Sequence, residues 1–153
     1  MLQRIQTVYL LLVAILMLIV VFFPLAVVQS GNTLYSFDVF GLNTLLGEKE
    51  LIYPVRGLFV LVVVILAVAM TTIFLFKKRL LQIRLTIFNT ILLLGFYGLF
   101  AYLIYLFKGE LSDFSYSLKF AASFPAVCIV LNYLAIRNIG ADEALVRSLD
   151  RLR

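Results

Sequence analysis

The sequence contains no histidine and a single cysteine, Cys128, among its 153 residues. Histidine is the commonest general base and the commonest transition-metal ligand in proteins, so its absence removes the usual side chain for both kinds of site. One cysteine excludes an intramolecular disulfide and a multi-cysteine metal site. We therefore expect no catalytic residues, no metal site and no cofactor, and we interpret the chain as non-enzymatic.

Charged residues are also scarce. They make up 14% of the chain, whereas soluble domains carry about a quarter. Hydrophobic residues reach 64%, and the mean hydropathy is +1.12. This composition is typical of an integral membrane protein.

Four apolar runs separate the charged residues. A bilayer core about 30 Å thick needs about 20 helical residues, and backbone amides in lipid must pair within their own segment. The runs predict spans at residues 7–28, 57–76, 86–107 and 120–136, with outer loops 29–56 and 108–119, an inner loop 77–85 and a tail 137–153. The first run is longer than a signal-peptide core of about 7–15 residues, so we expect it to be retained. The fold class expected is therefore an all-α membrane protein of one domain, an antiparallel four-transmembrane-helix bundle.

The basic residues are distributed unevenly over the two sides of this bundle. Nine Lys and Arg lie in the N-terminal segment, the loop 77–85 and the tail, whereas four lie in the outer loops. Because Lys and Arg accumulate in cytoplasmic loops, both termini are predicted to be cytoplasmic. The net charge of +5 is thus a sign of membrane orientation, and it does not indicate nucleic-acid binding.

The first outer loop contains the alternating stretch TLYSFDVF. It places Tyr35, Phe37 and Val39 on one face, which is the period of a half-buried strand. The stretch ELIYP is expected to pair with it in a small extracytoplasmic β-hairpin. An isolated hairpin is marginally stable in water, so this one should rest on the helix ends or on the aromatic second loop. Whether the loop is a binding site stays open.

Polar residues within the predicted spans are few, and Asn89, Thr90 and Asn132 are the candidate intramembrane positions. Such groups commonly form hydrogen bonds between helices or to their own backbone. Helix packing is the favoured interpretation. The alternative is a polar conduction or substrate site in a small oligomeric transporter or channel component.

The tail has a helical pattern of its own. Leu145, Leu149 and Leu152 fall at i, i+4 and i+7, with acidic residues at the start and arginines at the end. Gly140 is expected to end the preceding helix. We expect a short C-terminal amphipathic cytoplasmic helix, which either lies along the inner leaflet against anionic head groups of membrane lipids or docks to a protein partner.

The opening MLQRIQTVYLLL and the ending DEALVRSLDRLR resemble the DUF4293 family, a family of small integral membrane proteins of Bacteroidota. The resemblance implies a multi-pass protein of the bacterial inner membrane and assigns no activity. It draws attention to polar residues at both ends, and Arg4 is expected to meet Asp142, Glu143 or Asp150 there. The candidate cytoplasmic interaction cluster comprises Gln3, Arg4, Gln6, Asp142, Glu143, Arg147, Ser148, Asp150 and Arg151.

The function favoured by the sequence is that of a non-catalytic accessory or scaffold subunit. Its partner would bind the C-terminal helix or the outer loop, and a homo-oligomer is compatible with the sequence. The transporter or channel component remains the alternative.

Overall fold

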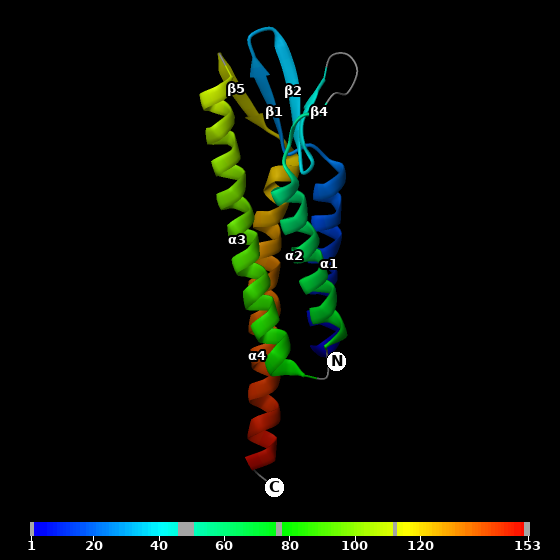
Figure 1. The fold of residues 1–153 in the computed structure, drawn as a ribbon. Coiled ribbons are helices and arrows are strands. Elements are labelled where there is room, and N and C mark those ends of the chain that lie inside the picture. Colours follow the sequence, from blue (N-terminus) through cyan, green and yellow to red (C-terminus); the bar gives the residue numbers. More distant parts are fainter. Residues whose placement is uncertain (1, 46–50, 76–77, 112, 152–153) are drawn as a thin grey trace.

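The computed structural model describes residues 2–45, 51–75, 78–111 and 113–151, and every structural statement below concerns these residues. Four long helices run side by side: α1 (Leu2–Phe22), α2 (Arg56–Phe74), α3 (Arg79–Glu110) and α4 (Phe124–Arg151) (Figure 1). Each of α1 and α3 packs against both α2 and α4. All four are long and apolar enough to cross a membrane, so the fold is compatible with a membrane helical bundle.

The two ends of the bundle differ. Both chain termini lie at one end, here called the terminal end, and the strands lie at the other, the sheet end (Figure 1). Helix α3 begins at Arg79, seven residues before the expected span at 86, and therefore carries its first two turns into the terminal end. The polar residues of these turns contribute to the cluster described below.

The first helix is shorter than its apolar run. Helix α1 ends at Phe22, two residues before Pro24, and Ala26–Ser30 form strand β1. Proline disfavours helical backbone in the residue before it, which explains the end of the helix at this point. The expected span 7–28 therefore includes residues that belong to the sheet.

The predicted hairpin is wrong in extent, because the sheet has five antiparallel strands. These are β1, β2 (Thr33–Asp38), β3 (Gly41–Thr44), β4 (Leu51–Pro54) and β5 (Phe114–Leu118), in the order β4-β3-β2-β1-β5. The segment ELIYP pairs through β4 with β3 and not with the TLYSFD strand. Strand β5 comes from the second outer loop and pairs with β1, so the sheet joins both outer loops.

The helix predicted as a separate amphipathic segment is part of α4. This helix runs from Phe124 to Arg151 without interruption, and Gly140 lies inside it. A glycine within a helix costs about 1 kcal/mol relative to alanine, which the hydrogen-bonded turns on both sides outweigh. The end of α4 keeps the direction of the bundle and extends beyond the other three helices (Figure 1). The expectation of a break at Gly140 was therefore wrong.

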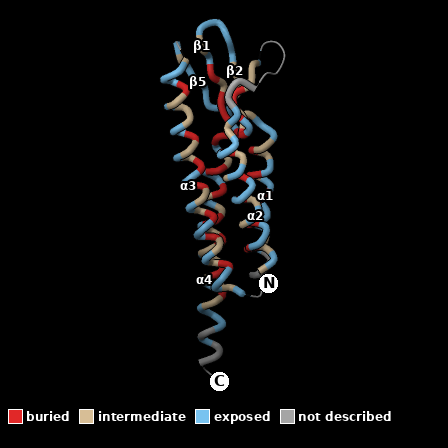
Figure 2. The backbone as a smooth tube through the Cα atoms, viewed as in Figure 1, coloured by how far each residue is buried: buried red, intermediate tan, exposed pale blue. Residues whose placement is uncertain are grey.

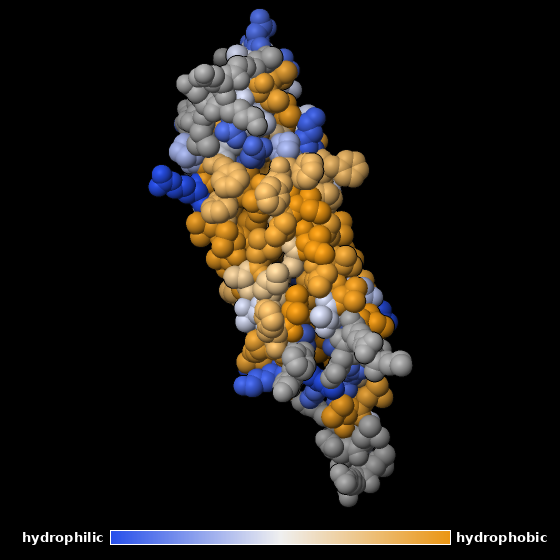
Figure 3. Space-filling model, turned by 90° about the vertical axis from the view of Figure 1, so that its right-hand side faces the viewer, coloured by the Kyte–Doolittle hydropathy of each residue, from blue (hydrophilic) through white to orange (hydrophobic). Residues whose placement is uncertain are grey.

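On the face of the molecule shown in Figure 3, the surface between the two ends is mostly apolar. Large apolar side chains such as Val60, Ile91 and Val130 are more than half exposed, whereas buried residues recur along the inner sides of the helices (Figure 2). A soluble protein does not leave so large an apolar surface in water. This surface is compatible with a location of the bundle in a membrane.

Phe37 fixes the sheet to the helices. It is fully buried on β2, with its ring stacked on Phe100 at a centroid distance of 5.5 Å and edge-on to Phe107 at 5.4 Å. Both partners belong to α3, which is why the sheet sits directly on the bundle.

We predict that Phe37→Ala lowers the free energy of unfolding by about 3–5 kcal/mol, because it removes both ring contacts and leaves a cavity. Unfolding of the purified chain in mixed detergent micelles measures the effect. The matched control is Leu34→Ala on the same strand, where the side chain is 37% exposed. An equal loss in the two variants would show that the ring contacts do not hold the sheet in place.

Candidate functional site

A buried polar contact at the terminal end joins α1 to α4. The Gln6 side-chain amide donates a hydrogen bond from Nε2 to Oδ2 of Asp142 over 3.1 Å, across 136 positions of sequence. Both side chains are buried, with 4% and 8% of their surface exposed. The structure thus brings together two members of the candidate cluster, one from each end of the chain.

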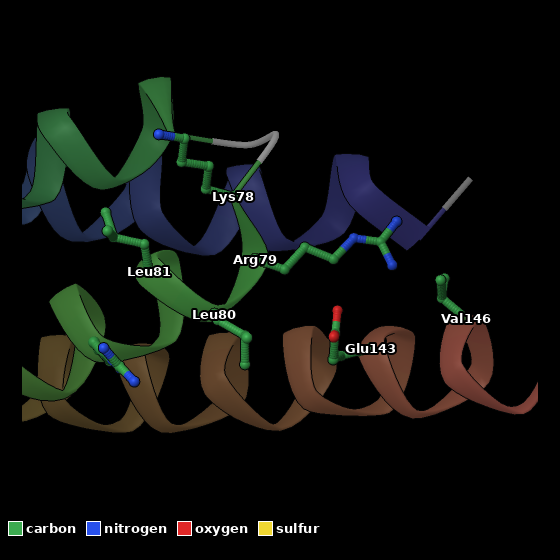
Figure 4. A pocket seen from close by; sticks show the side chains of 7 residues that line it. Lys78, Arg79, Leu80, Leu81, Glu143 and Val146 are labelled. Carbon is green, nitrogen blue, oxygen red and sulfur yellow. The ribbon is translucent and has the colours of Figure 1, made fainter. Parts of the chain in front are cut away.

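Helix α3 reaches the same residue. The Arg79 guanidinium donates to the backbone carbonyl of Asp142 at 3.4 Å. Its side chain extends from the first turn of α3 across to α4 (Figure 4). Asp142 is therefore the point at which α1, α3 and α4 are linked by polar contacts.

Arg79 is not among the residues of the candidate cluster predicted from the sequence. Arg4 is predicted to contact the tail instead, because the resemblance draws attention to the N-terminal segment and both ends are expected on the same side of the membrane. A signal for Arg79 was available, since the basic stretch KKR lies on the same predicted side as the acidic residues of the tail. The antiparallel order of the last two helices also places the start of one beside the end of the other.

A second contact ties α2 to α3 beside this link. Gln82, which is 2% exposed, donates from Nε2 to the backbone carbonyl of Thr72 at 3.3 Å. The Thr86 hydroxyl donates to the carbonyl of Gln82 at 2.8 Å. Gln6, Gln82 and Asp142 are buried at this end and are here called the terminal polar layer. Their hydrogen bonds join α1 to α4 and α3 to α2, and the Arg79 contact with Asp142 links the two pairs of helices.

The other residues of the candidate cluster are distributed differently. Ser148 is exposed, and its hydroxyl donates to the carbonyl of Leu145 in the same helix at 2.7 Å. Glu143 is partly buried and lines a cavity beside Arg79. The side chains of Gln3, Arg4, Arg147, Asp150 and Arg151 lie outside the described part of the structure. The contact expected for Arg4 therefore stays a prediction.

Two buried carboxamides lie deeper in the bundle. Asn89 on α3 and Asn132 on α4 are 1% and 0% exposed, and their side-chain N and O atoms make no hydrogen bond to the described residues. Thr90 differs, because its hydroxyl donates to the carbonyl of Thr86 at 2.9 Å. Among the described residues, Asp38 on β2 also has one buried oxygen without a partner, Oδ1, whereas each asparagine has both of its side-chain polar atoms unpaired.

Helix register places these asparagines at the same depth. Asn89 follows Arg79 by ten residues, and Asn132 precedes Asp142 by ten. Arg79 contacts Asp142, and α3 and α4 run antiparallel. Ten residues from Arg79 along α3 and ten residues back from Asp142 along α4 therefore reach the same depth in the bundle. Toward the sheet end the same pairing is fixed by Tyr97, whose hydroxyl donates to the Ala122 carbonyl at 2.7 Å and accepts from the Ala126 amide at 2.9 Å.

The described residues contain no group of three or more His, Cys, Asp or Glu side chains that could hold a metal ion. The polar groups at the terminal end act instead as hydrogen-bond partners between helices. Amide and carboxylate groups buried in this way orient helices strongly, because an unpaired partner would be costly.

We predict that Asp142→Ala lowers the free energy of unfolding by about 1–3 kcal/mol, because it leaves the buried Gln6 amide without its acceptor. A double-mutant cycle with Gln6→Ala in detergent micelles should give a coupling energy of at least about 0.5 kcal/mol. Glu110→Ala, at the exposed end of α3, serves as the control. Strictly additive effects would show that the hydrogen bond does not link the helices.

We predict that Asn89→Leu and Asn132→Leu each raise the free energy of unfolding by about 1–3 kcal/mol, because a buried polar group without a partner is replaced by an apolar one. Thr86→Val should change it by about 0.6 kcal/mol or less, since that hydroxyl bonds within its own helix. The same micelle assay measures all three. A clear loss of stability in both leucine variants would indicate that the carboxamides bind a group essential to the fold.

Comparison with known proteins places the chain in one family. The model of a family described as Domain of unknown function (DUF4293) matches residues 2–152. No curated protein matches the chain. Because the match covers nearly the whole sequence, the protein belongs to the DUF4293 family.

Proposed function

We propose that this chain is a non-catalytic accessory or scaffold subunit of the bacterial inner membrane, which docks a partner protein through the end of α4. The observation that carries this proposal is the extension of α4 beyond the other helices (Figure 1). Residues 145–151 form the part of the helix beyond Asp142 and Ala144, and they are called the α4 extension below.

The orientation is part of the proposal. Nine of the thirteen basic residues lie in the segments of the terminal end, which is the charge distribution of a cytoplasmic face. The termini would then be cytoplasmic, and the five-stranded sheet would lie on the opposite side of the membrane. An inner-membrane location is also what the resemblance of the two terminal segments to the DUF4293 family implies.

The α4 extension presents apolar side chains at its start. Leu145 is 56% exposed and Val146 is 40% exposed, although both lie beyond the terminal polar layer. Because the helix keeps the bundle direction past the terminal polar layer, we infer that its extension leaves the bilayer and that these apolar side chains are available to a protein surface. The partner we propose carries an apolar groove that accepts one face of a helix.

The alternative, a small oligomeric transporter or channel component, is supported by one observation. Asn89 and Asn132 are buried polar groups at one level of the bundle and have incomplete bonding. The cavities lined by Arg79, by Phe124 and by Tyr105 include neither asparagine. We therefore favour the accessory role.

We predict that a photo-crosslinking amino acid in place of Leu145 gives one protein adduct of defined mass in intact cells. The same probe at Val60, which is 57% exposed on α2 and faces the lipid, should give no such adduct. Probe placed at Val146 should give the same product, and adding Leu145→Glu to that variant should abolish it. Immunoblotting and mass spectrometry of the adduct are the readouts.

The orientation is tested with the same position. Leu145→Cys should react with a membrane-impermeant maleimide in inverted vesicles and not in intact spheroplasts, whereas the parental chain should stay unlabelled because Cys128 is fully buried. Labelling in spheroplasts would overturn the cytoplasmic assignment. Equal adducts from Leu145 and Val60 would overturn the docking role.

A further inference from the structure

A cavity of about 620 Å³ opens at the terminal end, between the start of α3 and the last turns of α4. Its side chains come from both helices and from the residue before α3 (Figure 4). The lining residues are Lys78, Arg79, Leu80, Leu81, Arg84, Glu143 and Val146. A cavity of this volume accommodates a group the size of a small organic molecule, considerably larger than inorganic phosphate.

The charge of the lining is positive. Three cations and one carboxylate give a formal charge of 3 − 1 = +2. Arg79 already donates to the Asp142 carbonyl, so the terminal polar layer holds it in place. Lys78 and Arg84 are exposed, and their positive ends are accessible to an anion from solution or from the membrane surface.

The apolar part of the lining indicates that the anion belongs to a lipid. Leu80 and Leu81 are 53% and 41% exposed beside the cations. One to two turns further along α3, Ile87 and Phe88 are 45% and 47% exposed and belong to the apolar surface of the bundle. The cavity therefore lies where charged surface meets apolar surface, the level at which a phospholipid phosphate sits while its acyl chains run along the helix.

We propose that this cavity binds the head group of an anionic phospholipid, with Lys78 and Arg84 contacting its phosphate and Leu80 and Leu81 contacting the start of its acyl chains. Basic pockets between membrane helices bind anionic head groups in this way. Arg79 acts as a positioning residue, because it keeps α3 and α4 together at the cavity. The proposal does not depend on the partner protein proposed above.

The test is native mass spectrometry of the full chain released from detergent micelles, titrated with phosphatidylglycerol. The parental protein should retain phosphatidylglycerol and should retain phosphatidylcholine much less. The double variant Lys78→Gln with Arg84→Gln should bind phosphatidylglycerol about ten- to thirtyfold more weakly, since each basic residue near anionic lipid contributes about fivefold. Lys78→Arg with Arg84→Lys should restore binding, because the charges are kept.

The matched control is Arg56→Gln with Lys119→Gln, which removes the same charge from two exposed positions at the sheet end. This variant should bind phosphatidylglycerol as the parental chain does. The proposal is overturned if the control loses as much binding as the cavity variant. Equal retention of phosphatidylcholine would also overturn it, because the site would then not select the negative charge of the head group. Full displacement of the lipid by inorganic phosphate would overturn it as well, because the site would then not require the acyl chains.

Discussion

The central constraint on this protein is that the outer surface of its helices is apolar over most of their length. Exposed side chains such as Val60 and Ile91 can contact lipid, but a polar group in the same positions would lose its hydrogen bonds to water. The charged side chains of the described residues therefore lie toward the two ends of the bundle, and the amides of Asn89 and Asn132 are buried. The hydrogen bonds of the polar side chains at these positions determine which helices are held together.

The terminal end shows how this confinement organises the molecule. Gln6, Gln82 and Asp142 are buried there, and their hydrogen bonds join α1 to α4 and α3 to α2. Arg79 joins the same layer and also lines the cavity proposed to bind lipid. The layer thus stabilises the bundle, positions the start of the α4 extension and holds the cavity in shape. The deeper pair, Asn89 and Asn132, has no comparable bonding among the described residues, which sets it apart from this structural role.

The sheet end is held together by strand pairing and by aromatic packing. Its five strands come from two outer loops, and the pairing of β1 with β5 closes one loop onto the other. Phe37 then packs the sheet onto α3 through two ring contacts. A short sheet of this kind gains its stability from an apolar face covered by helices, which explains why it forms at the bundle end.

The sequence by itself was sufficient to indicate four apolar helices and the alternation around Phe37, because these depend on local composition and period. The family was indicated by the resemblance of the two terminal segments. The sequence was not sufficient for strands β1 and β5. The first lies inside an apolar run, and the second was missed although Phe114, Tyr116 and Leu118 alternate with serines. Nor did it show that α4 continues through Gly140, or that Arg79 meets Asp142. These features depend on pairing between segments far apart in the chain, where hydrogen bonds and packing across helices outweigh local preference, and only the tertiary structure decides them.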